Sequence, residues 1–123
     1  MQRRALISVV DDDVSSREAL PDLLEMLGFE TRTFASAEDF LASEVLADTQ
    51  CLILDVSMPG MSGPQLQGEL SRREMKIPII FVTAHRDQNL RADLVARGAV
   101  ACLFKPFSEQ DLSAALTRAL GTA

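Results

Sequence analysis

The sequence has too few basic residues to hold nucleic acid or an anionic membrane through bulk charge. Its 123 residues include 12 Lys and Arg against 18 Asp and Glu, and the formal net charge is −6. A surface of that sign repels phosphate backbones and anionic lipid headgroups. We therefore expect no direct nucleic-acid binding by this domain and no membrane partner.

Long hydrophobic runs are also missing. No apolar stretch approaches the roughly 20 residues that a membrane-spanning helix requires. The N-terminal MQRR leads into a strand-like segment, residues 5–10, that is too short for a signal peptide. We expect a cytoplasmic protein whose residues 1–123 form one domain with a core of its own.

The sequence holds only two cysteines, Cys51 and Cys102, and both fall in apolar, strand-like runs. If those strands lie two apart in one sheet, they are separated by about 10 Å, which is beyond the reach of a disulfide. We expect both to be reduced, buried thiols that pack as small apolar side chains. The only histidine, His85, cannot form a metal site alone.

Glycine-rich phosphate-binding loops are absent as well. Neither G-x-G-x-x-G nor G-x-x-x-x-G-K-[ST] occurs in the chain. These two motifs carry the dinucleotide fold and the P-loop, so both kinds of nucleotide site are excluded.

What the chain does have is a central stretch that ends at a carboxylate. Residues 51–63 read CLILDVSMPGMSG: an apolar run stops at Asp55 and then breaks into Pro and Gly. A short apolar run bounded by turn residues is typical of a strand buried on both faces, as in a parallel sheet. Asp55 is then at the carboxyl end of the strand, where ligands bind in open α/β sheets.

Short apolar runs alternate with amphipathic ones along the whole chain. This alternation predicts an α/β fold, a single doubly wound five-stranded parallel sheet with helices on both faces. The alternating pattern of FETRTF suits an edge strand. Strands are expected at residues 5–10, 29–34, 51–55, 79–82 and 99–104, each followed by a helix.

Capping residues mark several of the expected helix starts. Pro21 lies inside the first helical pattern, where it removes a backbone donor and is expected to kink the helix or delay its regular part. Gly28 and Gly98 suit helix ends. The expected caps are Asp13, Ser36 with Asp39, Ser62 with Gln65, Asp87, and Ser108 with Asp111.

Polar residues stand at the carboxyl ends of four predicted strands, which meet at one edge of the sheet. They are Asp11, Asp12 and Asp13, then Asp55, Thr83 and Lys105. Clustered carboxylates repel one another, and Mg²⁺, which prefers oxygen ligands, relieves that repulsion. A pocket of acids rimmed by a hydroxyl and an ammonium suits phosphoryl transfer, in which a carboxylate can attack phosphorus.

Each of these residues also has a purely structural interpretation. Acids at a helix start act as caps, a Lys-Pro pair can be a solvated turn, and Thr is common in strands. Met58 and Met61 are better explained by loop packing than by ligand binding. The joint placement of the polar residues at one sheet edge favours a functional site.

At these positions the chain resembles the receiver domain of two-component response regulators, the CheY-like family. The matching segments are VVDDD, LDVSMPGMSG, FVTAH and LFKPF, in order and at matching strand ends. The local sequences RGAVACLFKPF and GFETRTFASAEDFL are most similar to those of receivers of the FixJ and NarL type. The resemblance covers essentially the whole chain and implies a flavodoxin-like sheet of strand order 2-1-3-4-5 with five helices.

The resemblance also implies a role for each site residue. Asp55 would accept the phosphoryl group. Mg²⁺ would bind Asp12 directly, Asp11 largely through water, Asp55, and the backbone carbonyl of Ser57. Thr83 and Lys105 would bind phosphoryl oxygens, Ala84 would leave the phosphoryl group room, and the Lys105–Pro106 peptide bond would be cis. His85, which cannot form a metal site alone, is interpreted separately as a residue at the rim of the site.

The implied function is a phosphorylation switch rather than an enzyme with a separate substrate. The phosphoryl group would come from the phosphohistidine of a histidine kinase or phosphotransfer protein, and the domain would assist its own phosphorylation and dephosphorylation. The surface of the fourth helix, fifth strand and fifth helix would then change, to control an output domain or partner, to regulate transcription or to form a homodimer.

One position departs from the family pattern. Three residues before Lys105, many members carry a Tyr or Phe whose ring turns inward when the Thr moves, whereas this chain has Cys102. The resemblance therefore does not imply that this chain relays its signal through the rotamer of an aromatic side chain.

Two other functions fit the sequence less well. Phosphatases of the haloacid-dehalogenase-like class generally carry an acid two residues after their nucleophile, but Ser57 stands there, and 123 residues leave no room for a substrate cap. A receiver-like module that works without phosphorylation is disfavoured by the intact set of pocket residues.

Overall fold

Five parallel strands form the centre of the molecule, and the computed structural model describes residues 4–121. The strands are β1 (Leu6–Val10), β2 (Glu30–Phe34), β3 (Cys51–Asp55), β4 (Ile79–Thr83) and β5 (Ala101–Phe104). They pair in the order β2-β1-β3-β4-β5, and every pair is parallel. The predicted fold class and strand order are confirmed.

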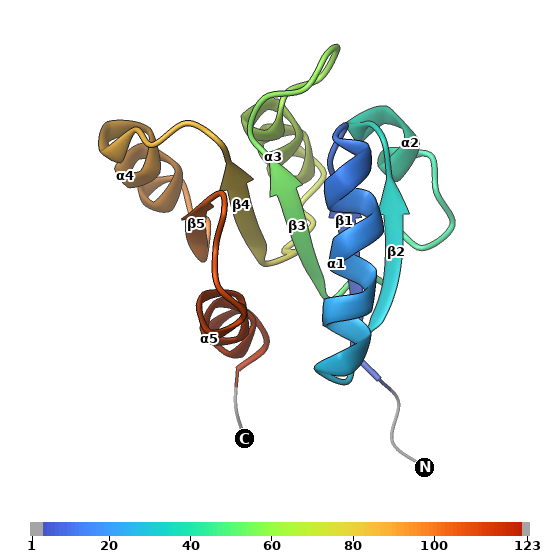
Figure 1. Cartoon of the computed structure of the whole chain (residues 1–123). Coiled ribbons are helices and arrows are strands. Elements are labelled where there is room, and N and C mark those ends of the chain that lie inside the picture. The colour runs from blue at the N-terminus through green and yellow to red at the C-terminus, as the bar shows by residue number, and fades with distance from the viewer. Residues whose placement is uncertain (1–3, 122–123) are drawn as a thin grey trace.

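Helices cover both faces of the sheet (Figure 1). The first face carries α1 (Val14–Met26) and α5 (Glu109–Leu120), and the second carries α2 (Ala37–Leu41), α3 (Gly63–Arg72) and α4 (Gln88–Ala96). Side chains alternate along each strand, so β1 sends Ile7 to the face of α1 and α5 and Val10 to the opposite face. Two apolar cores result, one on each side of the sheet.

The strands differ in exposure as their sequences predict. The central strands β1, β3 and β4 are buried along their whole length, whereas β2 is exposed or half-buried at every residue and lies at an edge of the sheet. The fifth strand is shorter than expected, because Ala99 donates its N–H to the carbonyl of Leu94 at 3.1 Å and thereby closes α4. Gly98, with φ of +106°, makes the turn between them.

The predicted caps are present, and α1 is not delayed at Pro21. Helix α1 begins at Val14, directly after its cap Asp13, and continues through Pro21 to Met26. The expected delay of the regular helix is therefore wrong. Leu20 and Leu24 are buried against the sheet on either side of the proline, and this packing stabilises the helix despite the missing N–H donor.

The two cysteines are free and buried, as predicted. Cys51 belongs to the core beneath α1 and α5, and Cys102 to the core on the opposite face of the sheet. Burial raises the pKa of the Cys51 thiol to about 12, which makes it unreactive. Within residues 4–121, no helix has the length and apolar character needed to cross a membrane.

Candidate functional site

The polar strand ends meet at one edge of the sheet, as expected of parallel strands. Asp11 follows β1, Asp55 ends β3, Thr83 ends β4 and Lys105 follows β5. In the described part of the chain five polar or charged residues are buried, and three of them, Asp11, Asp55 and Thr83, lie at this edge. Burying such groups is costly unless they are paired or used, so their grouping marks the edge as a site.

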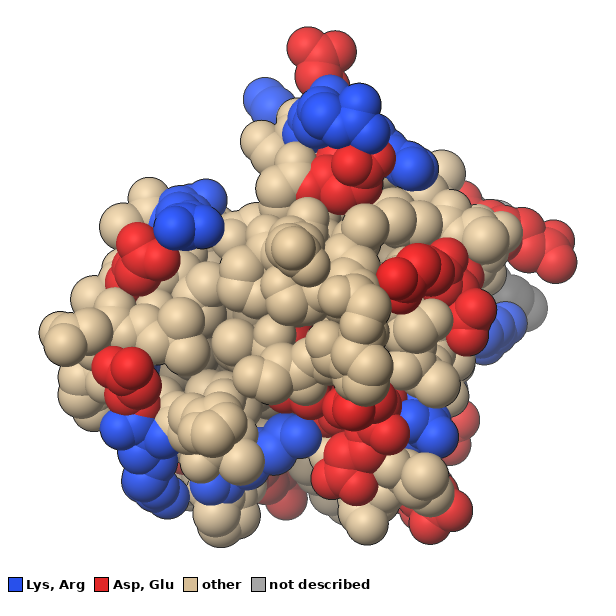
Figure 2. Space-filling view, turned by 90° about the horizontal axis from the view of Figure 1, so that it is seen from above, with Lys and Arg blue, Asp and Glu red and all other residues tan. Residues whose placement is uncertain are grey.

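Three carboxylates form the centre of this site. Asp11, Asp12 and Asp55 each offer an oxygen, and these oxygens all lie within 4.8 Å of one another. Asp11 is fully buried and Asp55 is 8% exposed, while Asp12 is open to solvent. Seen from above, acidic and basic side chains lie next to one another near the lower centre of the view (Figure 2).

The surroundings of Asp55 destabilise the charged form of its carboxylate. Burial and, after it, the repulsion of Asp11 raise its pKa from 3.8 to about 7, against the attraction of Lys105. A divalent cation with oxygen ligands would relieve both effects, since it restores the solvation lost on burial and neutralises the repulsion. Asp11, Asp12 and Asp55 therefore fit a Mg²⁺ site.

Asp13, the last acid of the run, does not belong to this cluster. Its Oδ1 accepts the backbone N–H of Ser15 at 3.1 Å and caps α1. Its own N–H donates to Asp11 Oδ1 at 3.0 Å, which helps to hold the Asp11 side chain. The structural interpretation of this acid is thus confirmed.

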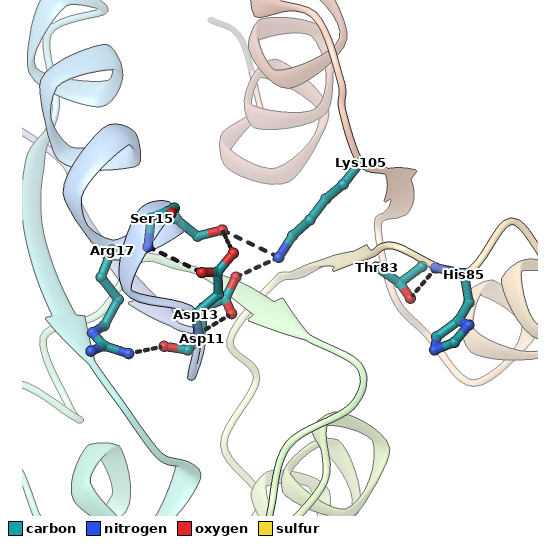
Figure 3. Close-up of polar contacts among 8 residues, drawn as sticks. Asp11, Asp13, Ser15, Arg17, Thr83, His85 and Lys105 are labelled. Carbon is teal, nitrogen blue, oxygen red and sulfur yellow. Dashed lines mark hydrogen bonds and ion pairs between the residues drawn. The ribbon is translucent and has the colours of Figure 1, made fainter.

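Lys105 reaches the site from the loop after β5. Its Nζ donates to Asp11 Oδ2 at 2.8 Å (Figure 3). The same Nζ donates to Ser16 Oγ at 3.2 Å. The ammonium is therefore paired with Asp11 in this structure. Sequence reasoning missed Ser16, because a serine in the first turn of a helix carries no signal of a contact 89 residues away.

Thr83, the last residue of β4, contacts the backbone of Lys105 just beyond β5. The Lys105 N–H donates to the Thr83 carbonyl at 2.8 Å, and the Thr83 hydroxyl accepts the N–H of His85 at 3.1 Å. Ala84 and His85 are exposed at the rim, and the Lys105–Pro106 peptide bond is cis, as the resemblance implied. Thr83 thus links the site to the loop that leads into α4.

The loop after β3 is held by a residue that the sequence did not single out. Glu38, at the start of α2, accepts the N–H of Met61 at 3.1 Å through Oε2. Met58 is buried and Met61 packs on the same core, which agrees with loop packing. Ser57 lies in this loop with its side chain exposed, and its backbone carbonyl stays a predicted Mg²⁺ ligand.

Gly63 allows the chain to return closely past Asp55. A Cβ at this position would collide with the backbone carbonyl oxygen of Asp55, and it would lie 3.0 Å from both the Val56 Cα and a ring carbon of Phe81. The Gly63 N–H donates to the Val56 carbonyl at 2.9 Å, which fixes the close approach. Sequence reasoning missed this residue too, since the crowding comes from tertiary contact.

We predict that Gly63→Ala lowers the free energy of unfolding by about 1–3 kcal/mol, the usual cost of overpacking. Backbone atoms cannot move aside as a flexible side chain would. Gly68→Ala is the matched control, because Gly68 lies within α3 with open space around it, and alanine there should raise stability by roughly 0.5–1 kcal/mol. Urea titrations of both variants test this, and equal stability of Gly63→Ala and wild type would refute the crowding.

Comparison with known proteins agrees with this geometry. Residues 7–117 match the family model described as the response regulator receiver domain. The chain is 44% identical over 114 residues to the transcriptional regulatory protein TdiR of Thauera aromatica, covering 93% of this chain and 50% of that protein. It is 38% identical over 115 residues to FixJ of Azorhizobium caulinodans, covering 94% and 54%. The chain thus spans about half the length of these curated relatives.

Solved structures give the same result. The crystal structure of FixJ-N superposes with a TM-score of 0.86 at 32% identity, covering 99% of this chain and 98% of that one. The fold, the order of the strand-end residues and the family model coincide on the same segment of the sequence. The chain is therefore a member of the response regulator receiver domain family of two-component systems.

Proposed function

We propose that Asp55 accepts a phosphoryl group from the phosphohistidine of a histidine kinase or phosphotransfer protein. The observation that carries this proposal is the convergence of three carboxylates with Thr83 and Lys105 at one sheet edge. In the transfer, a carboxylate oxygen of Asp55 forms a bond to phosphorus while the bond from phosphorus to the donor nitrogen breaks. The electron pair of that bond leaves with the nitrogen.

Asp11, Asp12, Asp55 and the backbone carbonyl of Ser57 would hold Mg²⁺. When bound, the ion neutralises charge on the carboxylates and on the phosphoryl oxygens. The burial of Asp11 and Asp55 supports this set, since two buried like charges are costly without a cation between them.

Thr83 and Lys105 would bind the other phosphoryl oxygens. Thr83 is 1% exposed and ends the strand next to Asp55, and Lys105 carries the ammonium nearest to the carboxylates. By orienting the phosphoryl group, these side chains would assist both the phosphorylation and the dephosphorylation of their own domain. We infer a phosphoacceptor domain rather than an enzyme with a separate substrate.

Labelling by a small phosphodonor tests this function. Incubation with acetyl phosphate and Mg²⁺ should add one phosphoryl group that is stable in acid and labile in base, as expected for an acyl phosphate. The same incubation with excess EDTA should add none. A product stable in base would contradict an aspartyl phosphate.

The switched surface is proposed to be the one formed by α4, β5 and α5. Phe104 ends β5 there, and the guanidinium carbons of Arg91 and Arg86 lie 5.0 and 6.0 Å from its ring centroid. Arg86 belongs to the loop that follows Thr83, and Arg91 belongs to α4. A movement of Thr83 toward a phosphoryl group would therefore shift this loop. The shift would change the positions of the side chains on the surface of α4 and β5.

We predict that phosphorylation perturbs the backbone amides of residues 83–94 more than those around Cys102. Cys102 is 1% exposed and packs in the core, so it offers neither a ring to turn nor a free surface. A shift of the loop moves the N–H of His85, which now donates to Thr83. Amide chemical shifts measured before and after phosphorylation test this, and changes centred on Cys102 with residues 83–94 unmoved would refute it.

The output of the switch is proposed from the relatives. TdiR is named a transcriptional regulatory protein, and so is FixJ. We infer that this domain acts in the cytoplasm within a transcription-controlling response regulator, through an output domain, a partner or a phosphorylation-dependent homodimer formed by the surface of α4, β5 and α5. Direct nucleic-acid binding by the receiver itself is not part of the proposal, because its net charge is −6.

A further inference from the structure

Ser16 connects Lys105 to the start of α1. Its Oγ lies 3.2 Å from Lys105 Nζ and 3.4 Å from Asp13 Oδ2, and Lys105 Nζ lies 2.8 Å from Asp11 Oδ2 (Figure 3). The residue is half-buried in the first turn of α1. The ammonium is thus held from two sides, by a carboxylate and by a hydroxyl.

The direction of these hydrogen bonds follows from the groups involved. An ammonium can only donate, so the Ser16 hydroxyl accepts from Lys105 and keeps its own hydrogen for Asp13. Asp13 is anchored in turn by capping α1 through the N–H of Ser15. Hydrogen bonds to charged partners are stronger than those between neutral groups. These linked hydrogen bonds therefore favour one position of the Lys105 side chain.

In that position the Lys105 ammonium contacts both Asp11 and Ser16. The inference drawn from it rests on the proposed function, in which Lys105 binds a phosphoryl oxygen on Asp55. We propose that Ser16 is a positioning residue that holds Lys105 against Asp11 until a phosphoryl group forms. Lys105 gives up the Ser16 hydroxyl to reach the phosphoryl group, so Ser16 opposes the phosphorylated state.

Ser16→Ala removes the restraint with little effect on the fold, since alanine is the better helix former and Ser16 is only half-buried. Ser15→Ala is the matched control. It is the same substitution one residue earlier, at an exposed serine whose hydroxyl makes no protein hydrogen bond within residues 4–121. Both variants are compared with wild type in two measurements.

The first measurement is the affinity for beryllofluoride, a phosphoryl mimic, in the presence of Mg²⁺. We expect Ser16→Ala to bind it roughly two- to tenfold more tightly than wild type, the scale of one net hydrogen bond. The Ser15→Ala affinity should equal that of wild type. The second is NMR relaxation of the Lys105 side chain without metal, where Ser16→Ala should increase its mobility and Ser15→Ala should not.

The outcomes separate this inference from the proposed function. If wild type binds beryllofluoride and Ser16→Ala binds it equally or more weakly, the restraint is refuted while the phosphoacceptor function stands. Unchanged Lys105 mobility in Ser16→Ala refutes it as well. If the wild-type chain binds no beryllofluoride with Mg²⁺, the proposed function itself fails, and the restraint fails with it.

Discussion

An Asp55→Asn variant incubated with acetyl phosphate and Mg²⁺ will gain no base-labile phosphoryl group, whereas the wild-type chain will gain one. The amide is a poor nucleophile toward phosphorus and cannot form the acyl phosphate. The fold should survive, because the substitution keeps the shape of the side chain. It also removes the charge that Asp11 repels in a buried site. The variant should therefore be at least as stable to urea as wild type without metal.

Asp13→Asn is the matched control for this experiment. It removes the same charge two residues from Asp11, and Asn caps helices about as well as Asp does. Asp13 lies outside the three-carboxylate cluster, so this variant should be labelled fully. Full labelling of Asp55→Asn would instead exclude Asp55 as the acceptor.

The second large effect concerns Mg²⁺. Asp12→Asn should weaken Mg²⁺ binding by at least about tenfold. Removing a residue that only supports a metal ligand through a hydrogen bond already lowers metal affinity by about that factor. Asp12 is the solvent-exposed member of the cluster, so its replacement should leave stability nearly unchanged. Isothermal titration with MgCl₂ measures the change directly.

Asp13→Asn serves again as the control, since it changes the net charge by the same amount. A decrease in Mg²⁺ affinity caused by the change in net charge would appear in both variants. A decrease caused by removal of a metal ligand would appear only in Asp12→Asn. Undiminished Mg²⁺ binding in Asp12→Asn would place the metal elsewhere.

The sequence predicted the arrangement of the site because parallel strands bring their carboxyl ends together. Once the alternating pattern fixed a parallel sheet, Asp11, Asp55, Thr83 and Lys105 had to meet at one edge. The helix starts were equally predictable, since caps are local signals. Ser62 with Gln65 forms the expected capping box in the structure.

What the sequence could not predict depends on contacts between distant segments. Ser16 meets Lys105, Glu38 meets Met61, and the backbone at Gly63 passes against that of Asp55; each contact needs the packed fold. The expected delay of α1 at Pro21 was wrong for the opposite reason, because packing of α1 on the sheet outweighed a local rule. Tertiary burial outweighs the loss of one hydrogen bond.

Locating the phosphoryl group on the wild-type chain tests the central claim most directly. After incubation with acetyl phosphate and Mg²⁺, borohydride reduces an acyl phosphate to an alcohol and so marks the modified residue for mass spectrometry. We predict that the mark lies on Asp55 alone and that EDTA abolishes it. A mark on another residue, or one that EDTA does not diminish, would contradict the account.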